Sequence, residues 1–230
     1  MKAIIEITGP LNAGKTTLVM LLGEELLPEG ILYLDASPDG RLTQLLAPEL
    51  PSLTLAQLLE KQHRDALSGK EAIDWAFSDL PIAVGEEQEL LTLGALPELI
   101  APEALEKIRY GLLRFIENYD YVLVDGRHSV IHALWPPEIL QTLDIVTPSQ
   151  LAEWQLPESS PGGSLHTPAL IINAYRDEAL PPALTQALDT RQINLIGKLG
   201  VYATPYALNH QLPEDFKNCL LRFNIPYTPK

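Results

Sequence analysis

Apolar and polar positions fall into two kinds of segment along the chain. Short apolar runs, bounded by glycine, proline or one acidic residue, have the pattern of buried parallel strands. Such runs occupy residues 2–8, 31–36, 88–94, 121–126, 143–148, 168–174 and 194–203. Longer segments, with apolar residues three and four positions apart, predict helices. These segments are residues 16–27, 53–67, 70–77, 102–119, 181–189 and 213–223.

The order of these segments predicts an α/β fold. The strand at 2–8, the helix at 16–27 and the strand at 31–36 form a β-α-β unit, in which the two strands are parallel. Repetition of this order predicts a doubly wound, Rossmann-like, mostly parallel sheet of about seven strands flanked by helices. We expect a single domain over residues 1–230, with ligands bound beyond the carboxyl ends of the strands.

Charge and cysteine content narrow the class of protein. The net charge is −14, and the sixteen basic residues are scattered, so direct non-specific DNA binding is not expected. The only cysteine, Cys219, can form neither an internal disulfide nor a cysteine-pair metal site. The chain has neither an apolar run of the roughly 18–20 residues that span a membrane nor a secretory signal. We expect a cytoplasmic protein without a membrane anchor.

The stretch Gly9–Thr16, GPLNAGKT, matches the P-loop pattern G-x-x-x-x-G-K-[ST] between a strand and a helix. Its glycines let backbone N–H groups approach phosphate oxygens, and the helix N-terminus favours negative charge. We expect Lys15 to contact the β and γ phosphates and Thr16 to bind Mg²⁺. The predicted nucleotide-binding residues of this loop are Gly9, Asn12, Ala13, Gly14, Lys15, Thr16 and Thr17.

Asp125 ends the apolar strand YVLVD at residues 121–125. A carboxylate there lies at the edge where a phosphate loop also opens, so Asp125 is predicted to hold Mg²⁺ together with Thr16. Lys15, Asp35, Asp39 and Asp125 are the candidate catalytic residues.

Segments beyond the phosphate loop resemble one family. They are LYLDASPDGRLTQLL (32–46), FIENYDYVLVDGRHSVIH (115–132), TLDIVTPS (142–149), LIINAYRD (170–177) and LIGKLGVYATPYALNHQ (195–211). In letters and in order they resemble the first switch, the second switch and the later strands of ParA/MinD-like ATPases. These are P-loop proteins of the SIMIBI class with a deviant Walker A motif.

The resemblance implies a homodimer with Mg²⁺ and ATP, or ADP after hydrolysis, between its subunits. It implies a role in positioning, partition or assembly through a partner protein, for example in plasmid or DNA segregation or transfer. Asn173 matches the asparagine that contacts adenine, although a turn-capping role is the alternative, and Pro205 and Tyr206 match the base-flanking loop. Arg176 stands where an aspartate would bind guanine, which favours ATP over GTP.

Two residues depart from the family pattern. Pro10 replaces the signature lysine that follows the first glycine, and proline offers neither a charge nor an N–H donor. Ser37 replaces the switch aspartate that orients the attacking water, and loss of such a group costs about 10²–10⁴-fold in rate. We therefore expect ATP binding with weak or absent ATP hydrolysis.

Three residues in the segment that follows Asp125 are further candidates for binding a phosphate or a metal. Arg127 is a candidate substitute for the missing lysine, in its own subunit or across a dimer, and a solvated loop arginine is the alternative. His128 and His132 have the spacing of a metal-binding pair on a helix, but the sequence shows no third ligand.

Two other functions stay open at this point. One is a catalytically inactive P-loop binding module that recruits a partner constitutively. The other is a metallochaperone GTPase of the UreG or CobW type, whose phosphate loops resemble GPLNAGKTTL. The missing guanine motif and metal-binding cysteines argue against the second.

Overall fold

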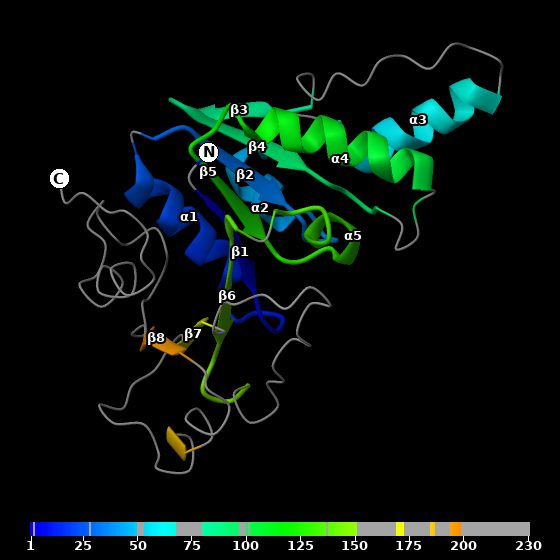
Figure 1. Cartoon of the computed structure of the whole chain (residues 1–230). Helices are drawn as coiled ribbons and strands as arrows, with labels where there is room; N and C mark the ends of the chain where they lie inside the picture. The colour runs from blue at the N-terminus through cyan, green and yellow to red at the C-terminus, as the bar shows by residue number, and fades with distance from the viewer. Residues whose placement is uncertain are drawn as a thin grey trace. The chain divides into compact units, whose positions relative to one another are not determined.

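The computed structural model describes residues 1, 3–27, 29–49, 53–67, 80–96, 100, 102–136, 138–150, 169–172, 185–186 and 194–198 (Figure 1). Contacts divide the chain into two compact units. The first is Met1–Glu6 with Leu27–Leu140, and the second is Ile7–Leu26 with Gln141–Lys230. The boundary falls inside strand β1, Ala3–Thr8, so β1 contributes residues to both units.

The first unit is built on a mostly parallel sheet. Besides β1 its strands are β2 (Ile31–Asp35), β3 (Ile82–Gly85), β4 (Gln88–Thr92) and β5 (Tyr121–Asp125). The strand order is β3-β4-β2-β5-β1. Strand β2 pairs in parallel with both β4 and β5, and the register places Asp35 beside Thr92 on one side and Asp125 on the other. Two acidic residues therefore end neighbouring strands at the same level.

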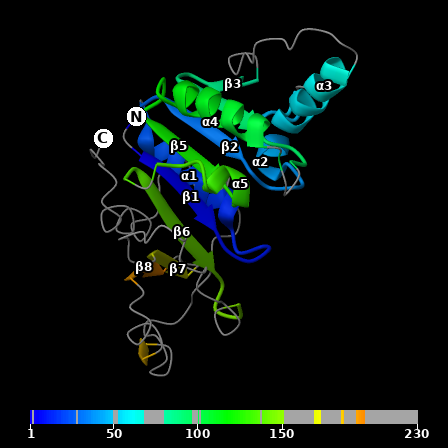
Figure 2. The ribbon, with the colours of Figure 1, turned by 45° about the vertical axis from the view of Figure 1, so that its right-hand side comes forward.

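Helices cover this sheet. They are α2 (Arg41–Leu46), α3 (Leu55–Leu67), α4 (Pro102–Ile116) and α5 (Ser129–His132). Helix α4 runs along the strands in both views (Figure 1 and Figure 2), and its Ile108, Leu112 and Ile116 are fully buried in one apolar cluster with residues of β2 and β5. Burial of each such side chain contributes about 1.5–3 kcal/mol. These three residues are four positions apart, which is part of the helical spacing that predicted this helix.

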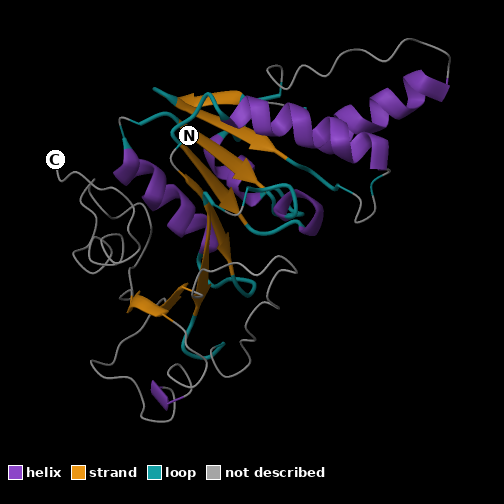
Figure 3. Ribbon diagram, in the orientation of Figure 1, coloured by secondary structure: helices purple, strands orange, loops and turns teal. Residues whose placement is uncertain are grey.

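The second unit contains helix α1, Lys15–Leu26, directly after the phosphate loop. Its strands beyond β1 are β6 (Leu140–Val146), β7 (Ala169–Ile172) and β8 (Asn194–Lys198), and Figure 3 draws strands in orange. Their order in the sheet is β1-β6-β7-β8. Strand β7 pairs in parallel with both β6 and β8. Apolar residues dominate β6 and β7, which is the pattern from which these strands were predicted.

The predicted fold class, a mostly parallel sheet flanked by helices, is confirmed. Strand β3 was not predicted. It is an antiparallel edge strand on β4, joined to it by a turn in which Glu87 has a φ of 58°. The predicted helices at 70–77 and 213–223 lie outside the described residues. The single domain over residues 1–230 stays a prediction.

Candidate functional site

The backbone of the phosphate loop requires its glycines. Gly9 has a φ of 140°, and a Cβ placed on it would lie 2.1 Å from the carbonyl oxygen of Ile145 in β6. Gly14, with a φ of 103°, comes directly before α1, and Asn12 has a φ of 62°. Side chains other than asparagine and aspartate rarely adopt such positive φ values. The loop is therefore a compact turn that only this type of sequence forms easily.

Lys15 reaches back across this loop. Its Nζ donates hydrogen bonds to the carbonyl oxygens of Gly9 (2.9 Å) and Pro10 (2.8 Å). The same Pro10 carbonyl accepts from the backbone N–H of Ala13 (3.3 Å). Pro10 thus contributes to the loop through its carbonyl oxygen, a hydrogen-bond acceptor that proline keeps although it lacks an N–H. The ammonium group is held at the loop, where a P-loop lysine is required.

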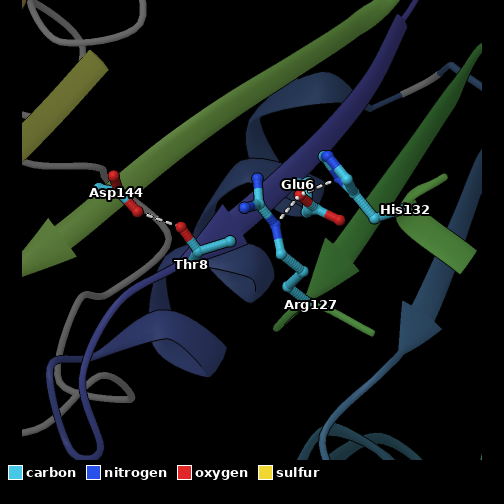
Figure 4. A network of polar contacts seen from close by, with 5 residues as sticks. All are labelled: Glu6, Thr8, Arg127, His132 and Asp144. Carbon is cyan, nitrogen blue, oxygen red and sulfur yellow. Dashed lines mark hydrogen bonds and ion pairs between the residues drawn. The ribbon is translucent and has the colours of Figure 1, made fainter. Parts of the chain in front are cut away.

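Two contacts from β6 and the turn after it support the loop. Thr8, directly before Gly9, donates its hydroxyl to Asp144, which is only 4% exposed (Figure 4). Gln150 Nε2 donates to the carbonyl oxygen of Leu11 (2.8 Å). Thr8, directly before the loop, and Leu11, inside it, are therefore held by side chains more than 130 residues away in the sequence.

Asp35, a predicted catalytic residue, is fully buried and carries four hydrogen bonds. Its Oδ1 accepts from the backbone N–H (3.1 Å) and hydroxyl (2.5 Å) of Ser37. Its Oδ2 accepts from the backbone N–H (2.8 Å) and hydroxyl (2.7 Å) of Thr43. The Thr43 hydroxyl in turn accepts from that of Thr92 (2.7 Å), since its only proton is donated to Asp35. Asp35 therefore closes the loop of residues 36–43.

Ser37 is part of the same closed loop. Its hydroxyl donates to Asp35 and accepts from the backbone N–H of Arg41 (3.2 Å) at the start of α2. The side chain of Asp39 makes no hydrogen bond or ion pair that joins this network, while its carbonyl oxygen accepts from Gln44 Nε2 (2.8 Å). Of the acidic residues that the sequence singled out here, Asp35 is a loop anchor and Asp39 is exposed.

Asp125 ends β5 and is 1% exposed. It is the register partner of Asp35, and its carbonyl oxygen accepts from the backbone N–H of Ala36 (3.1 Å). Register partners in parallel strands point to the same face of the sheet, so the two carboxylates share one face. The prediction that Asp125 and Thr16 hold Mg²⁺ together stays a prediction.

Glu6, which the sequence reasoning missed, is the centre of a second polar network. It is 1% exposed in the middle of β1, between the fully buried Ile5 and Ile7. Its Oε2 accepts hydrogen bonds from Arg127 Nε (2.9 Å) and from His132 Nδ1 (2.9 Å) (Figure 4). The glutamate inside the apolar run KAIIEIT was the overlooked signal of a buried ion pair, since buried charges are paired.

The histidine pair does not form a metal site. His132 is bonded to Glu6, whereas Nε2 of His128 lies 3.3 Å from the carbonyl oxygen of Leu96. Within the described part of the chain, no three His, Cys, Asp or Glu side chains are grouped so as to hold a metal ion. The candidates for adenine contacts, Asn173, Pro205 and Tyr206, lie outside the described residues.

Searched over the described residues, the chain contains no helix that is both long and apolar enough for a membrane span. No protein-family model matches the chain, and no curated protein matches it.

Solved structures do match it over nearly the whole length. MinD of Aquifex aeolicus has 20% identity and a TM-score of 0.64, with 99% of this chain and 100% of that chain covered. An ATP complex of a Cyanothece McdA variant has 17% identity and a TM-score of 0.63, with 100% and 99% covered. A plasmid partition protein of Borrelia burgdorferi bound to AMPPNP has 15% identity and a TM-score of 0.60, with 97% and 98% covered. The chain therefore has a ParA/MinD-like fold, the fold of these MinD, McdA and plasmid partition proteins.

Proposed function

We propose that this chain is a ParA/MinD-like nucleotide switch that binds Mg·ATP, dimerises, and acts in positioning, partition or assembly through a partner protein in the cytoplasm. The observation that carries the proposal is the phosphate loop, in which Lys15 is held against the carbonyl oxygens of Gly9 and Pro10. The proteins of the same fold supply the ligand class, since the McdA variant is complexed with ATP and the partition protein with AMPPNP.

The residues of the loop fit a nucleoside triphosphate. Gly9 is packed so closely against Ile145 that a side chain there would displace the loop, and the positive φ of Gly14 sets the entry into α1. In this proposal the backbone N–H groups of residues 12–17 contact the phosphates and Lys15 neutralises them. Thr16 and Asp125 supply the hydroxyl and carboxylate oxygens that Mg²⁺ prefers, and the ion would neutralise phosphate charge there. Asn173, Pro205 and Tyr206 would contact adenine.

Weak or absent hydrolysis is part of the proposal. Ser37 stands where the family carries its water-orienting aspartate, and its hydroxyl donates its only proton to Asp35 and accepts a hydrogen bond from the backbone N–H of Arg41. A hydroxyl has no carboxylate charge and accepts no proton from a water at neutral pH, so it cannot replace the aspartate as a base. We assign Asp35 a positioning role, because both of its oxygens hold the loop of residues 36–43.

Calorimetry with ATP, ADP and GTP in the presence of Mg²⁺ tests the ligand. We expect micromolar or tighter ATP binding that Lys15→Ala abolishes, while Lys61→Ala, an exposed lysine of α3, leaves it unchanged. ATP affinity that survives Lys15→Ala would overturn the proposal. GTP binding tighter than ATP binding would support the metallochaperone GTPase instead.

Sedimentation with a non-hydrolysable ATP analogue tests dimerisation. A dimer that forms with the analogue and not with ADP is expected of a switch. A chain that stays in one state with either nucleotide, and releases no phosphate above the Lys15→Ala background, is the inactive binding module. MinD of Aquifex aeolicus forms a complex with MinC, so a partner screen belongs to the same experiment.

A further inference from the structure

The side chain of Gln150 joins two stretches of backbone within the second unit. Its Oε1 accepts from the backbone N–H of Thr147 (3.1 Å), and its Nε2 donates to the carbonyl oxygen of Leu11 (2.8 Å). The first contact lies within the turn that follows β6, where the backbone N–H of Gln150 also donates to the Thr147 carbonyl oxygen (3.0 Å). The second contact reaches the phosphate loop, 139 positions away. Because one partner is a donor and the other an acceptor, only one orientation of the amide satisfies both.

The contact with Leu11 fixes a peptide plane of the phosphate loop. In a trans peptide the carbonyl group and the N–H that follows it point in opposite directions. With the Leu11 carbonyl directed at Gln150, the N–H of Asn12 is therefore directed away from Gln150. This N–H donates to no acceptor among the described residues. Asn12 has a φ of 62°, and turns with such a left-handed residue gather N–H groups into a concavity that binds anions.

The peptide groups before Leu11 are held from within the loop. The carbonyl oxygens of Gly9 and Pro10 both accept from Lys15 Nζ. The next carbonyl oxygen along the chain, that of Leu11, accepts instead from Gln150, outside the loop. This contact does not depend on Lys15, so it holds the middle of the loop while Lys15 contacts a phosphate.

We infer that Gln150 is a positioning residue for the nucleotide: by holding the Leu11 carbonyl, it orients the N–H of Asn12 toward a phosphate oxygen. This inference rests on the proposed function, because the ligand is the phosphate chain of the same Mg·ATP. It adds the side chain that orients one of the phosphate-binding N–H groups from outside the loop. Gln150 and the loop lie in the same compact unit, and the turn after β6 thereby becomes part of the nucleotide site.

Calorimetry of Mg·ATP binding to the full chain tests this role with two variants. Gln150→Met is neutral and of similar size, and it loses both amide contacts. Gln150→Glu keeps an oxygen for the Thr147 N–H but replaces the donor to Leu11 with a second acceptor. We expect ATP affinity to fall about threefold to tenfold in both variants, since each loses the contribution of one hydrogen bond to the loop. Should Gln150→Met unfold, Gln150→Glu carries the test, because it keeps the contact within the turn.

Gln57→Met is the matched control. The Oε1 of Gln57 accepts from the backbone N–H of Thr54 (3.0 Å), three positions earlier, as Gln150 does from Thr147. This pair lies at the start of α3 in the first unit, so Gln57→Met should bind ATP as the wild type does. If Gln150→Met loses affinity while Gln150→Glu binds as the wild type does, the effect belongs to the turn, and the inference is overturned.

The backbone amide signal of Asn12 is a readout that a merely structural role would not move. The chemical shift of an amide nitrogen responds to a hydrogen bond accepted by the preceding carbonyl group, here that of Leu11. In nitrogen–proton correlation spectra without nucleotide, both Gln150 variants are expected to shift the Asn12 signal, and Gln57→Met is not. Mg·ATP is expected to move this signal further in the wild type than in either Gln150 variant. An Asn12 signal that is the same in all of these proteins would overturn the inference.

The affinities also separate this inference from the proposed function. If both Gln150 variants bind Mg·ATP as tightly as the wild type, while Lys15→Ala does not bind, the inference is wrong and the proposed function stands. If the wild type binds no Mg·ATP, the proposed function fails, and the inference fails with it.

Discussion

The loop after β2 and the segment after β5 leave neighbouring strands at the same level, but different bonds hold them. Residues 36–43 fold back on Asp35 through hydrogen bonds that join residues two and eight positions apart. Arg127 and His132 are bonded to Glu6, which lies 121 and 126 positions earlier in the chain. The first is a local structure, whereas the second depends on β1.

Because of this difference, the loop of residues 36–43 is harder to release than the segment after β5. Asp35 is saturated by two backbone N–H groups and two hydroxyls, so rearrangement of its loop leaves several buried groups without partners. Glu6 holds its segment through an ion pair with Arg127 and a hydrogen bond from His132, both to one oxygen. In a nucleotide switch, we therefore expect the segment after β5 to respond to ligand first.

Removal of the Asp35 carboxylate is expected to have the largest effect. Asp35→Ala breaks four hydrogen bonds and leaves two backbone N–H groups without their acceptor, which should lower the free energy of unfolding by about 3–5 kcal/mol. Urea unfolding measures this change. The control is Asp39→Ala, an exposed side chain, with an expected change within about 0.5 kcal/mol. Equal effects of the two variants would show that the loop is not anchored by Asp35.

Removal of the Arg127 side chain is expected to have the next largest effect. Arg127→Ala leaves the buried Glu6 with His132 as its remaining partner among the described residues, at a cost of about 2–3 kcal/mol. Arg127→Lys should recover most of this stability, because an ammonium group also pairs with the carboxylate. If Arg127→Ala did not change the stability measured by thermal unfolding, the segment after β5 would not be held through Glu6.

The same contrast explains what the sequence could predict. The phosphate loop, the carboxylate at the end of β5 and the parallel sheet depend on short-range patterns, and each was predicted. The role of Asp35 as an anchor also depends on neighbours within eight residues, but its position after a P-loop helix favoured a catalytic interpretation. The Asx-type bond from the backbone N–H of Ser37, two residues after Asp35, was the overlooked local signal.

Long-range contacts account for most of what could not be predicted. The partners of Glu6, and Asp144 as the partner of Thr8, lie more than 120 residues away, and nothing in their spacing connects them. Strand β3 was missed because it has four residues of alternating, partial burial and a turn with a glutamate at positive φ. Such a turn lacks the glycine or asparagine that marks a hairpin in a sequence.

An aspartate at position 37, where ParA/MinD-like ATPases carry one, tests the loop of residues 36–43 further. Ser37→Asp places a second carboxylate beside Asp35 and removes the hydroxyl that donates to it. We expect a loss of about 1–2 kcal/mol in the free energy of unfolding and no gain in phosphate release, because the surrounding loop is built around a serine. Ser37→Ala is the control for loss of the hydroxyl alone. A gain of tenfold or more in turnover would show that this loop can orient a water once a carboxylate is present.

A partly buried carboxylate contact outside both segments gives the smallest expected effect and a reference for the other two. The hydroxyl of Tyr119, just before β5, donates to Glu89 in β4. Burial, and then the hydrogen bond to Glu89 and its charge, raise the pKa of Tyr119 well above its ordinary value. Tyr119→Phe should cost about 1 kcal/mol at neutral pH.

Because the folded-state pKa of Tyr119 is raised, this contribution is complete below about pH 10 and is lost as the pH rises further, when the tyrosine of the unfolded chain ionises first. Urea unfolding of both proteins at pH 8 and pH 10.5 should therefore show the difference between them shrinking. A difference independent of pH would mean that the contact does not keep the phenol protonated.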